Sequence, residues 1–277
     1  MAWADGDTLV QGFQWAGLHA WPLYLAWLTL SIAVTAAATC WPRSGPLPNA
    51  APANAAPGPR VGLGLFMLAT GAAVFAALAS QLGAGLTLDQ ADLAFAAGLQ
   101  AQLPAAVLPW FAVLTRLANT STLTGLGVLV AMLLLLRNRP VLAWLWVLAV
   151  GGNGLLNPAL KHLYGRARPL AEHAYLLASG YSFPSGHSSA AVVAYGMLAC
   201  LAQRSLPARW RPAAIGVAVL MIGTVGTSRL FLGVHFASDV LAGFASGTAW
   251  LGGCLTVWGL SDRRIATHAT HATAPEP

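Results

Sequence analysis

Three short clusters of polar residues stand out in a chain that is otherwise almost entirely apolar. They bring three of the fourteen basic residues, two of the seven histidines and one of the eight acidic residues into one stretch. Cations beside paired histidines suit phosphate binding and phosphoryl transfer, so this stretch is the candidate site. The eleven positions are Lys161, Arg168, Pro169, Pro184, Ser185, Gly186, His187, Ser228, Arg229, His235 and Asp239.

The third cluster contains a histidine and an acid at a helical spacing. Residues four apart share a face of a helix, which places the carboxylate of Asp239 beside the ring of His235. The carboxylate then accepts from one ring nitrogen and leaves the lone pair of the other free to attack. It also stabilises the imidazolium that forms, as covalent catalysis requires. The alternative is a His–Asp pair that only fastens two helices, and the pair alone does not decide between them.

The second cluster lies at the head of an apolar run. Backbone N–H groups at a helix N-terminus bind anions, and Gly186 lets the backbone approach a ligand closely. His187 stands at the same place and can donate a proton to a leaving oxygen. Simple capping of the helix by Ser185 or Ser188 is the alternative. Capping is favoured for the serine alone, and a phosphate site is favoured for the whole tetrapeptide beside a basic loop.

The remaining motif residues are cations. Lys161, Arg168 and Arg229 supply positive charge and planar forks that match the oxygens of a phosphoryl group. Contact with lipid headgroups at the membrane surface is the alternative. That alternative stays open for Arg166, which lies outside the spacing pattern.

Paired histidines also raise the possibility of a metal site. His187 and His235 have only Asp239 as a third ligand, and the surrounding cations repel a metal ion. The chain has no Cys pair and no His-Glu-x-x-His run. We therefore expect neither a metal nor another cofactor.

Composition indicates an integral membrane protein. Apolar residues make up 57% of the chain and charged residues 8%, against about 25% charged in soluble domains. The mean hydropathy is +0.65. The net charge of +6 comes from dispersed arginines, which excludes a nucleic-acid partner as the explanation. Cys40, Cys200 and Cys254 lie in or at the end of apolar runs and are expected to be buried free thiols.

Hydrophobic runs predict an all-α, polytopic bundle, because a spanning helix needs about 20 mostly apolar residues. Polar residues and prolines interrupt the pattern over 86–120, which we interpret as two short amphipathic helices on the membrane surface. An extra span there is disfavoured because its polar residues are costly in hydrocarbon. The seven predicted spans are about 20–40, 61–83, 121–136, 140–160, 187–203, 212–228 and 235–258.

These spans divide the chain into three parts and set its orientation. Residues 1–60 are predicted to form an additional N-terminal span and a flexible cytoplasmic loop, 61–260 the membrane domain, and 261–277 a disordered tail. Loops on the side away from the motif carry most of the arginines, so the motif is expected to face the periplasm or exterior. Short loops and helices rich in Ala and Gly favour a bacterial inner membrane. The arginines assigned to the cytoplasm are Arg43, Arg60, Arg137, Arg139, Arg204, Arg209, Arg211, Arg263 and Arg264.

The three clusters resemble the motif of the type 2 phosphatidic acid phosphatase superfamily, which includes membrane lipid phosphate phosphatases and soluble vanadium haloperoxidases. All eleven positions match. The resemblance implies a core of six helices, preceded here by one addition, and metal-independent dephosphorylation through a phosphohistidine. It implies that His235 is the nucleophile, Asp239 its orienting partner and His187 the general acid. The residues that resemble its phosphate cradle are Lys161, Arg168, Ser185, Gly186 and Arg229.

The expected function is that of a membrane lipid phosphatase. The substrate is a lipid phosphomonoester, or a lipid diphosphate that loses its terminal phosphate, in the outward leaflet of the bilayer. A lipid phosphotransferase that uses the same intermediate is one alternative, and a non-catalytic lipid-binding or transport protein is another. The haloperoxidase branch is disfavoured because its members are soluble. The sequence leaves open which lipid is the substrate and which oligomeric state the protein adopts.

Overall fold

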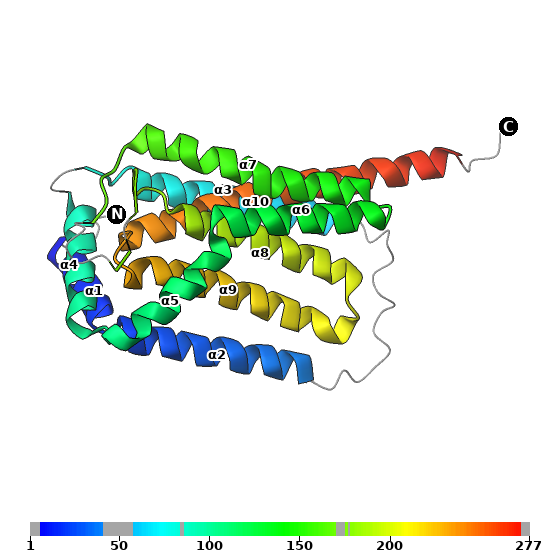
Figure 1. Ribbon diagram of the computed structural model, residues 1–277. Coiled ribbons are helices and arrows are strands. Elements are labelled where there is room, and N and C mark those ends of the chain that lie inside the picture. Colours follow the sequence, from blue (N-terminus) through cyan, green and yellow to red (C-terminus); the bar gives the residue numbers. More distant parts are fainter. Residues whose placement is uncertain (1–5, 41–57, 84–85, 170–174, 177, 273–277) are drawn as a thin grey trace.

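The computed structural model describes residues 6–40, 58–83, 86–169, 175–176 and 178–272, with the backbone alone for 58–59 and 263–272. All regular elements in these ranges are helices, which confirms the predicted all-α class (Figure 1). The loop predicted at 41–57 and the last five residues lie outside the described residues.

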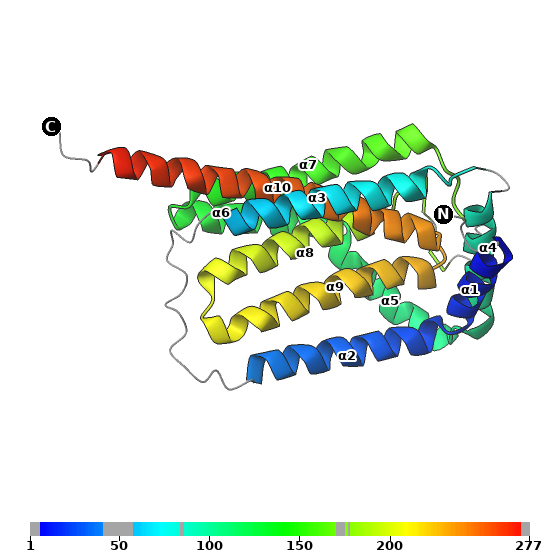
Figure 2. The same ribbon diagram turned by 180° about the vertical axis from the view of Figure 1, so that it is seen from behind.

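Among the described residues, seven long helices run side by side and form the bundle (Figures 1 and 2). Five helices are long and apolar enough to cross a membrane within the described ranges, and the protein is an integral membrane protein. These five are α2, α3, α7, α10, and α9 with the short turn before it; α6 is a shorter apolar helix. The long helices are α2 (Ala20–Cys40), α3 (Gly58–Ala79), α6 (Thr120–Leu136), α7 (Pro140–Tyr164), α8 (Gly186–Ser205), α9 (Arg211–Phe231) and α10 (Ala237–Ala272).

Helix α8 occupies the centre of the bundle. It packs against α7, α9 and α10, and its side chains Ala191 and Met197 are fully buried. It also buries Ser188 and Ser189. Because its neighbours are protein on most sides, this helix can carry polar residues that a lipid-facing span cannot. Its apolar character is therefore weaker than that of the outer helices.

The Gly- and Ala-rich helix α3 packs closely along α10, because small residues let two helix backbones approach each other. A Cβ atom placed on Gly71 would lie 2.6 Å from the backbone nitrogen of Ala249. A Cβ atom on Gly64 would lie 2.7 Å from the carbonyl oxygen of Gly252. Glycine at these positions lets the two backbones meet, and this fixes α10, whose first turn belongs to the candidate site.

Two helices cross one end of the bundle (Figure 1). They are α1 (Gly6–Leu18), for which the sequence analysis proposed no element, and α4 (Thr87–Gln102). A Cβ atom on Gly17 would lie 2.2 Å from the carbonyl oxygen of Phe95, so the two helices are in close contact. The chain then continues through η1 (Ala105–Val107), α5 (Leu108–Leu114) and η2 (Thr115–Ala118).

The break between α4 and the following segment confirms the two short helical pieces predicted within 86–120. The helix directions differ by 96°, and Pro104 stands at the bend. Together the two pieces also qualify as a broken span or re-entrant loop. The polar residues that suggested a surface helix have a different explanation, because Asp92 is fully buried and bonded within the protein.

The C-terminal helix is longer than predicted. Helix α10 continues to Ala272, whereas the sequence analysis ended the span at 258 and expected a disordered tail from 261. Residues 260–272 contain no glycine or proline that would stop a helix. Asp262 also pairs with Arg60 at 2.7 Å and with Arg204 at 2.5 Å, which ties this part of α10 to α3 and α8.

Candidate active site

The three motif clusters meet at the end of the bundle that α1 and α4 cross. Lys161 lies in the last turn of α7, just beyond the predicted span of about 140–160. The helix ends at Gly165, whose φ of 59° is in the left-handed region that glycine adopts without strain. This turn sends the chain across the first turns of α8 and α10, and so brings the first cluster to the other two.

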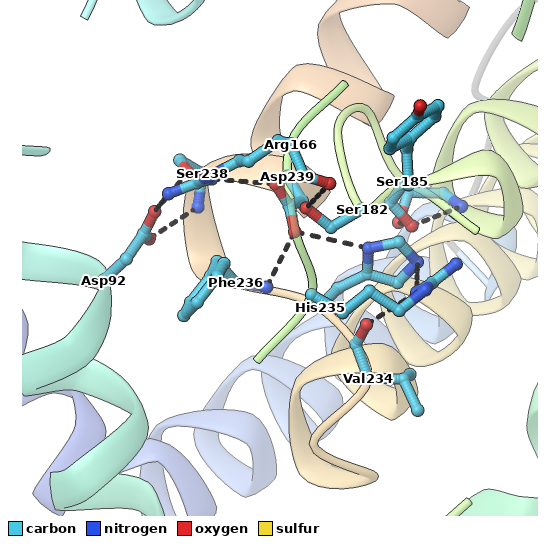
Figure 3. A network of polar contacts seen from close by, with 12 residues as sticks. Asp92, Arg166, Ser182, Ser185, Val234, His235, Phe236, Ser238 and Asp239 are labelled. Carbon is cyan, nitrogen blue, oxygen red and sulfur yellow. Dashed lines mark hydrogen bonds and ion pairs between the residues drawn. The ribbon is translucent and has the colours of Figure 1, made fainter. Parts of the chain in front are cut away.

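His235 lies in the short connection between α9 and α10, and Asp239 lies in the first turn of α10 (Figure 3). The predicted pairing is present, with 3.3 Å between Nδ1 of His235 and Oδ2 of Asp239. The same carboxylate oxygen accepts the backbone N–H of Phe236 at 2.9 Å. The acid is therefore fixed by the turn that carries the histidine.

The second ring nitrogen of His235 defines the tautomer. Nε2 lies 3.2 Å from Nη1 of Arg168. A guanidinium has only donors, so Nε2 is the acceptor and carries a lone pair. The ring proton then resides on Nδ1 and is donated to Asp239. The arrangement leaves the lone pair of Nε2 directed at the arginine of the first cluster, where a bound phosphate is expected.

Burial keeps this imidazole neutral. Removal from water lowers the pKa of His235 to about 4, although the hydrogen bond and charge of Asp239 act in the opposite direction. A neutral ring at physiological pH has the free electron pair that a nucleophile needs.

Backbone carbonyl groups hold two of the three cradle cations. Arg168 donates to the carbonyl oxygens of Val234 at 2.7 Å, Gly180 at 3.0 Å and Ser179 at 3.1 Å. Lys161 donates to the carbonyl oxygen of Tyr181. Carbonyl groups orient the cations without neutralising them, so their positive charge stays available for a phosphate.

Arg229 is buried near the end of α9 and is 6% exposed. Its Nη1 donates to Oγ1 of Thr115 at 2.8 Å. Its Nε has no hydrogen-bond partner among the described residues. Within the same ranges no carboxylate lies within 4.0 Å of Lys161, Arg168 or Arg229. A buried, unpaired donor is costly unless a ligand satisfies it, which is consistent with an anion site.

Ser185 caps helix α8, as the capping alternative proposed. Its Oγ accepts the backbone N–H of Ser188 at 3.4 Å and the Ser188 hydroxyl at 2.9 Å. Its own N–H donates to the carbonyl oxygen of Asp239 at 2.9 Å. Gly186 faces α7, where an added Cβ atom would lie 2.8 Å from Oδ1 of Asn157. These contacts bring the start of α8 to the histidine–aspartate pair, and a phosphate-binding role for both residues remains a prediction.

His187, in the first turn of α8, has a partner that the sequence analysis missed. Its Nε2 lies 2.9 Å from Oδ1 of Asn119, the residue that precedes α6. The two residues are far apart in the chain and no local pattern joins them. Arg229, Lys161 and Arg168 lie near enough for their positive charges to repel a positively charged His187 ring. The structure therefore brings both motif histidines and all three cradle cations into one site.

Arg166 makes contacts inside the site that were not predicted from the sequence. Its Nη1 pairs with Oδ1 of Asp239 at 2.8 Å and its Nη2 with Asp92 at 2.8 Å (Figure 3). Nη2 also pairs with Asp89 at 2.6 Å. The alternative of a lipid-headgroup contact is therefore wrong for this residue. The signal for the Arg166 contacts in the sequence is the acidic pair Asp89 and Asp92, which lies in the segment predicted to form surface helices.

The sequence of this chain is similar to a protein family model and to several known proteins. The PAP2 superfamily model matches residues 141–263. Phosphatidylglycerophosphatase B of Bacillus subtilis is 35% identical over 48% of this chain and 66% of its own length. A lipid A 1-phosphatase of Rhizobium johnstonii is 38% identical over 35% of this chain and 40% of its own length.

A solved structure is similar to a larger part of the chain than these sequence matches are. A crystal structure of a transmembrane PAP2 type phosphatidylglycerolphosphate phosphatase from Bacillus subtilis superposes with a TM-score of 0.58. It is 28% identical, and the match covers 74% of this chain and 96% of that one. The motif, the site that it forms and these relatives lead to one conclusion: the chain belongs to the PAP2 superfamily.

Proposed function

We propose that this protein is a membrane lipid phosphatase that acts through a covalent intermediate on His235. The observation that carries the proposal is the state of that ring. It is neutral, its Nδ1 proton is bound by Asp239, and its Nε2 lone pair faces Arg168. The names of the relatives, phosphatidylglycerophosphatase and lipid A 1-phosphatase, support a lipid phosphate as the substrate.

In the first step, the lone pair of His235 Nε2 attacks phosphorus and the bond from phosphorus to the lipid oxygen breaks. His187, which carries a proton on both ring nitrogens once the negative charge of the phosphate is bound, gives one of them to that leaving oxygen and becomes neutral. Lys161, Arg168 and Arg229 stabilise the charge on the three remaining phosphoryl oxygens. Asp239 stabilises the positive charge that develops on the ring of His235.

In the second step, water replaces the histidine. His187 takes a proton from the water, whose oxygen attacks phosphorus. The bond from phosphorus to Nε2 breaks, its electron pair returns to His235, and inorganic phosphate leaves. The same sequence of steps with a lipid hydroxyl in place of water would give the phosphotransferase alternative.

A groove beside the site supports a substrate with a hydrocarbon chain. The groove has a volume of about 770 Å³ and lies along α6, α7 and α8. Lys161, Gly186 and His187 line its site end, and Met132 and Leu135 lie near the opposite end of α6. The α6 residues that line it span about 20 Å at 1.5 Å per residue. A lipid tail in this groove would place its phosphate group beside the cations.

The arginine distribution supports an outward-facing site. The connections from α6 to α7 and from α8 to α9 lie at the end of the bundle opposite the site (Figures 1 and 2). They carry Arg137, Arg139 and Arg209. The positive-inside rule places these loops in the cytoplasm, and the site then faces the periplasm across a bacterial inner membrane. In this proposal residues 61–260 form the phosphatase domain and the preceding helices are additions to it.

The test is phosphate release by the purified protein in detergent. The substrates are a panel of lipid monophosphates and diphosphates, and each assay is run with and without excess EDTA. We expect release that EDTA leaves unchanged and that His235→Ala abolishes. His19→Ala, which changes an exposed histidine bonded to the backbone of Trp15, is the control.

Other outcomes would contradict the proposal. Release that EDTA abolishes would exclude the metal-independent mechanism. A radiolabel that moves from a donor lipid to an acceptor lipid without free phosphate would indicate the phosphotransferase. An absence of release and of transfer with every lipid in the panel would favour the binding or transport alternative.

A further inference from the structure

The guanidinium of Arg166 is shared between the candidate catalytic carboxylate and helix α4 (Figure 3). One edge of the fork, Nη1, donates to Asp239 at 2.8 Å and to the hydroxyl of Ser238 at 2.7 Å. The other, Nη2, donates to Asp89 at 2.6 Å and to Asp92 at 2.8 Å. The side chain is only 11% exposed, so water competes little for these donors.

Only an arginine side chain can make this set of contacts. Its planar fork offers donors in two directions, whereas the ammonium of a lysine is a single compact point. The ring of Phe236 covers one face of the guanidinium, with 4.6 Å between Cζ and the ring centre. The group is therefore fixed along its edges and against one face.

Helix α4 is attached to the same turn that carries Asp239. Oδ1 of Asp92 accepts the backbone N–H of Ser238 at 2.9 Å, and the Ser238 hydroxyl donates to Oδ2. Ser238 lies in the first turn of α10, where backbone N–H groups have no partner within the helix. The fully buried carboxyl group of Asp92 on α4 thus accepts a backbone N–H at the start of α10, one residue before Asp239.

The charges of this cluster bear on the nucleophile. Three carboxyl groups surround one guanidinium, and one of the three also holds His235. An ion pair with Asp239 alone would weaken the field of that carboxylate at the ring. Asp89 and Asp92 take up part of the positive charge of Arg166. Asp239 then keeps the negative charge that stabilises an imidazolium at His235.

We propose that Arg166, held by Asp89 and Asp92 of α4, is a positioning residue that fixes Asp239 and, through it, His235. This role rests on the proposed phosphatase function. In this proposal helix α4, which crosses the end of the bundle, sets the geometry of the His235–Asp239 pair.

The test compares variants by kcat and KM for release of phosphate from a lipid phosphate. Arg166→Lys keeps the charge and loses the fork. We expect its kcat to fall about 10- to 100-fold, as for other residues that orient a reactive group. KM should change little, because Arg166 acts through Asp239 and not on the substrate. Asp89→Asn should also lower kcat, by a smaller factor than Arg166→Lys.

Arg60 on α3, which contacts α10 far from the site, provides a matched control. Arg60 pairs with Asp262 at 2.7 Å and stands over the ring of Trp258 at 5.4 Å, so it makes the same kinds of contact as Arg166. Arg60→Lys should leave kcat and KM unchanged. Thermal melting in detergent compares the folding of all variants. If Arg166→Lys has a lower melting temperature than the wild type, the kinetics of Asp89→Asn test the proposal instead. The side chain of Asp89 is 24% exposed, so this substitution disturbs the fold less.

A double-mutant cycle tests the link between α4 and Arg166. Arg166→Lys combined with Asp89→Asn should lose less activity than the product of the two single losses, since both act through one contact. Independent losses, or a raised KM with unchanged kcat, would overturn the proposal. An inactive wild type would instead contradict the phosphatase function. An active wild type with a fully active Arg166→Lys contradicts only the role of Arg166.

Discussion

The side-chain oxygen of Asn119 lies 2.9 Å from Nε2 of His187. The oxygen of the amide is an acceptor, so this ring nitrogen carries a proton and donates it. The first histidine of the motif is therefore oriented by a neutral amide, whereas the second is oriented by the carboxylate of Asp239. This difference matches the proposed roles. A carboxylate stabilises a positive ring after attack. A neutral amide orients the ring of His187 without stabilising a positive charge on it, so a second proton, on Nδ1, is given up readily.

Asn119→Ala tests this orientation of the proposed general acid. We expect the rate of lipid phosphate hydrolysis to fall about 10-fold, a part of the roughly 10²- to 10⁴-fold effect of general acid catalysis. Hydrolysis of p-nitrophenyl phosphate should fall much less, because nitrophenolate leaves without a proton. The comparison of the two substrates is the measurement. Asn119→Asp retains an acceptor oxygen and is the control, and equal losses on both substrates would contradict the role given to His187.

Asp239→Asn tests the tautomer of His235. With its oxygen toward Arg166, the new amide would place its NH₂ group where Oδ2 now accepts from Phe236 and His235. It would lose both of these acceptor contacts, and the ring proton would move to Nε2. The nucleophilic lone pair would then be lost. We expect the rate of phosphate release to fall about 10²- to 10⁴-fold, with the fold retained. Asp262→Asn, at the other end of α10, is the comparison. A variant within threefold of the wild type would exclude Asp239 as the orienting partner.

Gly154→Leu tests whether the groove along α6 and α7 holds the lipid tail. Gly154 lines the groove and has nothing within 4 Å of an added Cβ atom, so a larger side chain enters the groove without a clash. We expect kcat/KM to fall about 10-fold for a long-chain lipid phosphate, as for a filled apolar pocket, and to stay unchanged for a short-chain one.

The exposed Gly125 on α6 provides the control for this substitution. It also has open space around an added Cβ atom and does not line the groove. Gly125→Leu should leave both substrates unaffected. If Gly154→Leu hydrolyses long- and short-chain substrates as the wild type does, the tail lies elsewhere.

A fourth prediction concerns the protonation of His235. Burial lowers its pKa from 6.5 to about 4, while Asp239 opposes the shift. The folded protein therefore favours the neutral ring. The contribution of this group to stability is present above about pH 6.5 and is lost as the pH falls from 6.5 to 4. Nuclear magnetic resonance of the ring of His235 in detergent micelles should give a midpoint near 4. His235→Gln assigns the signal, and a midpoint near 6.5 would show that the ring is hydrated and not buried.

Much of this protein could be read from its sequence, for physical reasons. Hydrocarbon excludes charge and unpaired backbone groups, so each lipid-facing span appears as a long apolar run, and helices α2, α3, α7 and α9 lie close to their predicted ranges. Transfer of a phosphoryl group requires particular residue types, so the motif from Lys161 to Asp239 was visible as an interruption of those runs. The pairing of His235 with Asp239 was predictable because only four residues separate them.

Other features depended on contacts that only the tertiary structure creates. Arg166 meets Asp92 across 74 positions, His187 meets Asn119 across 68, and Arg229 meets Thr115 across 114. No sequence periodicity relates residues so far apart. The polar residues of α4 predicted a solvent-exposed face, whereas Asp92 is buried in the folded protein. The sequence by itself determined which residues can carry out the chemistry, because composition and spacing follow from local and solvent forces. Only the packing of α4, η2 and the start of α6 against the bundle decided which side chains hold those residues in place.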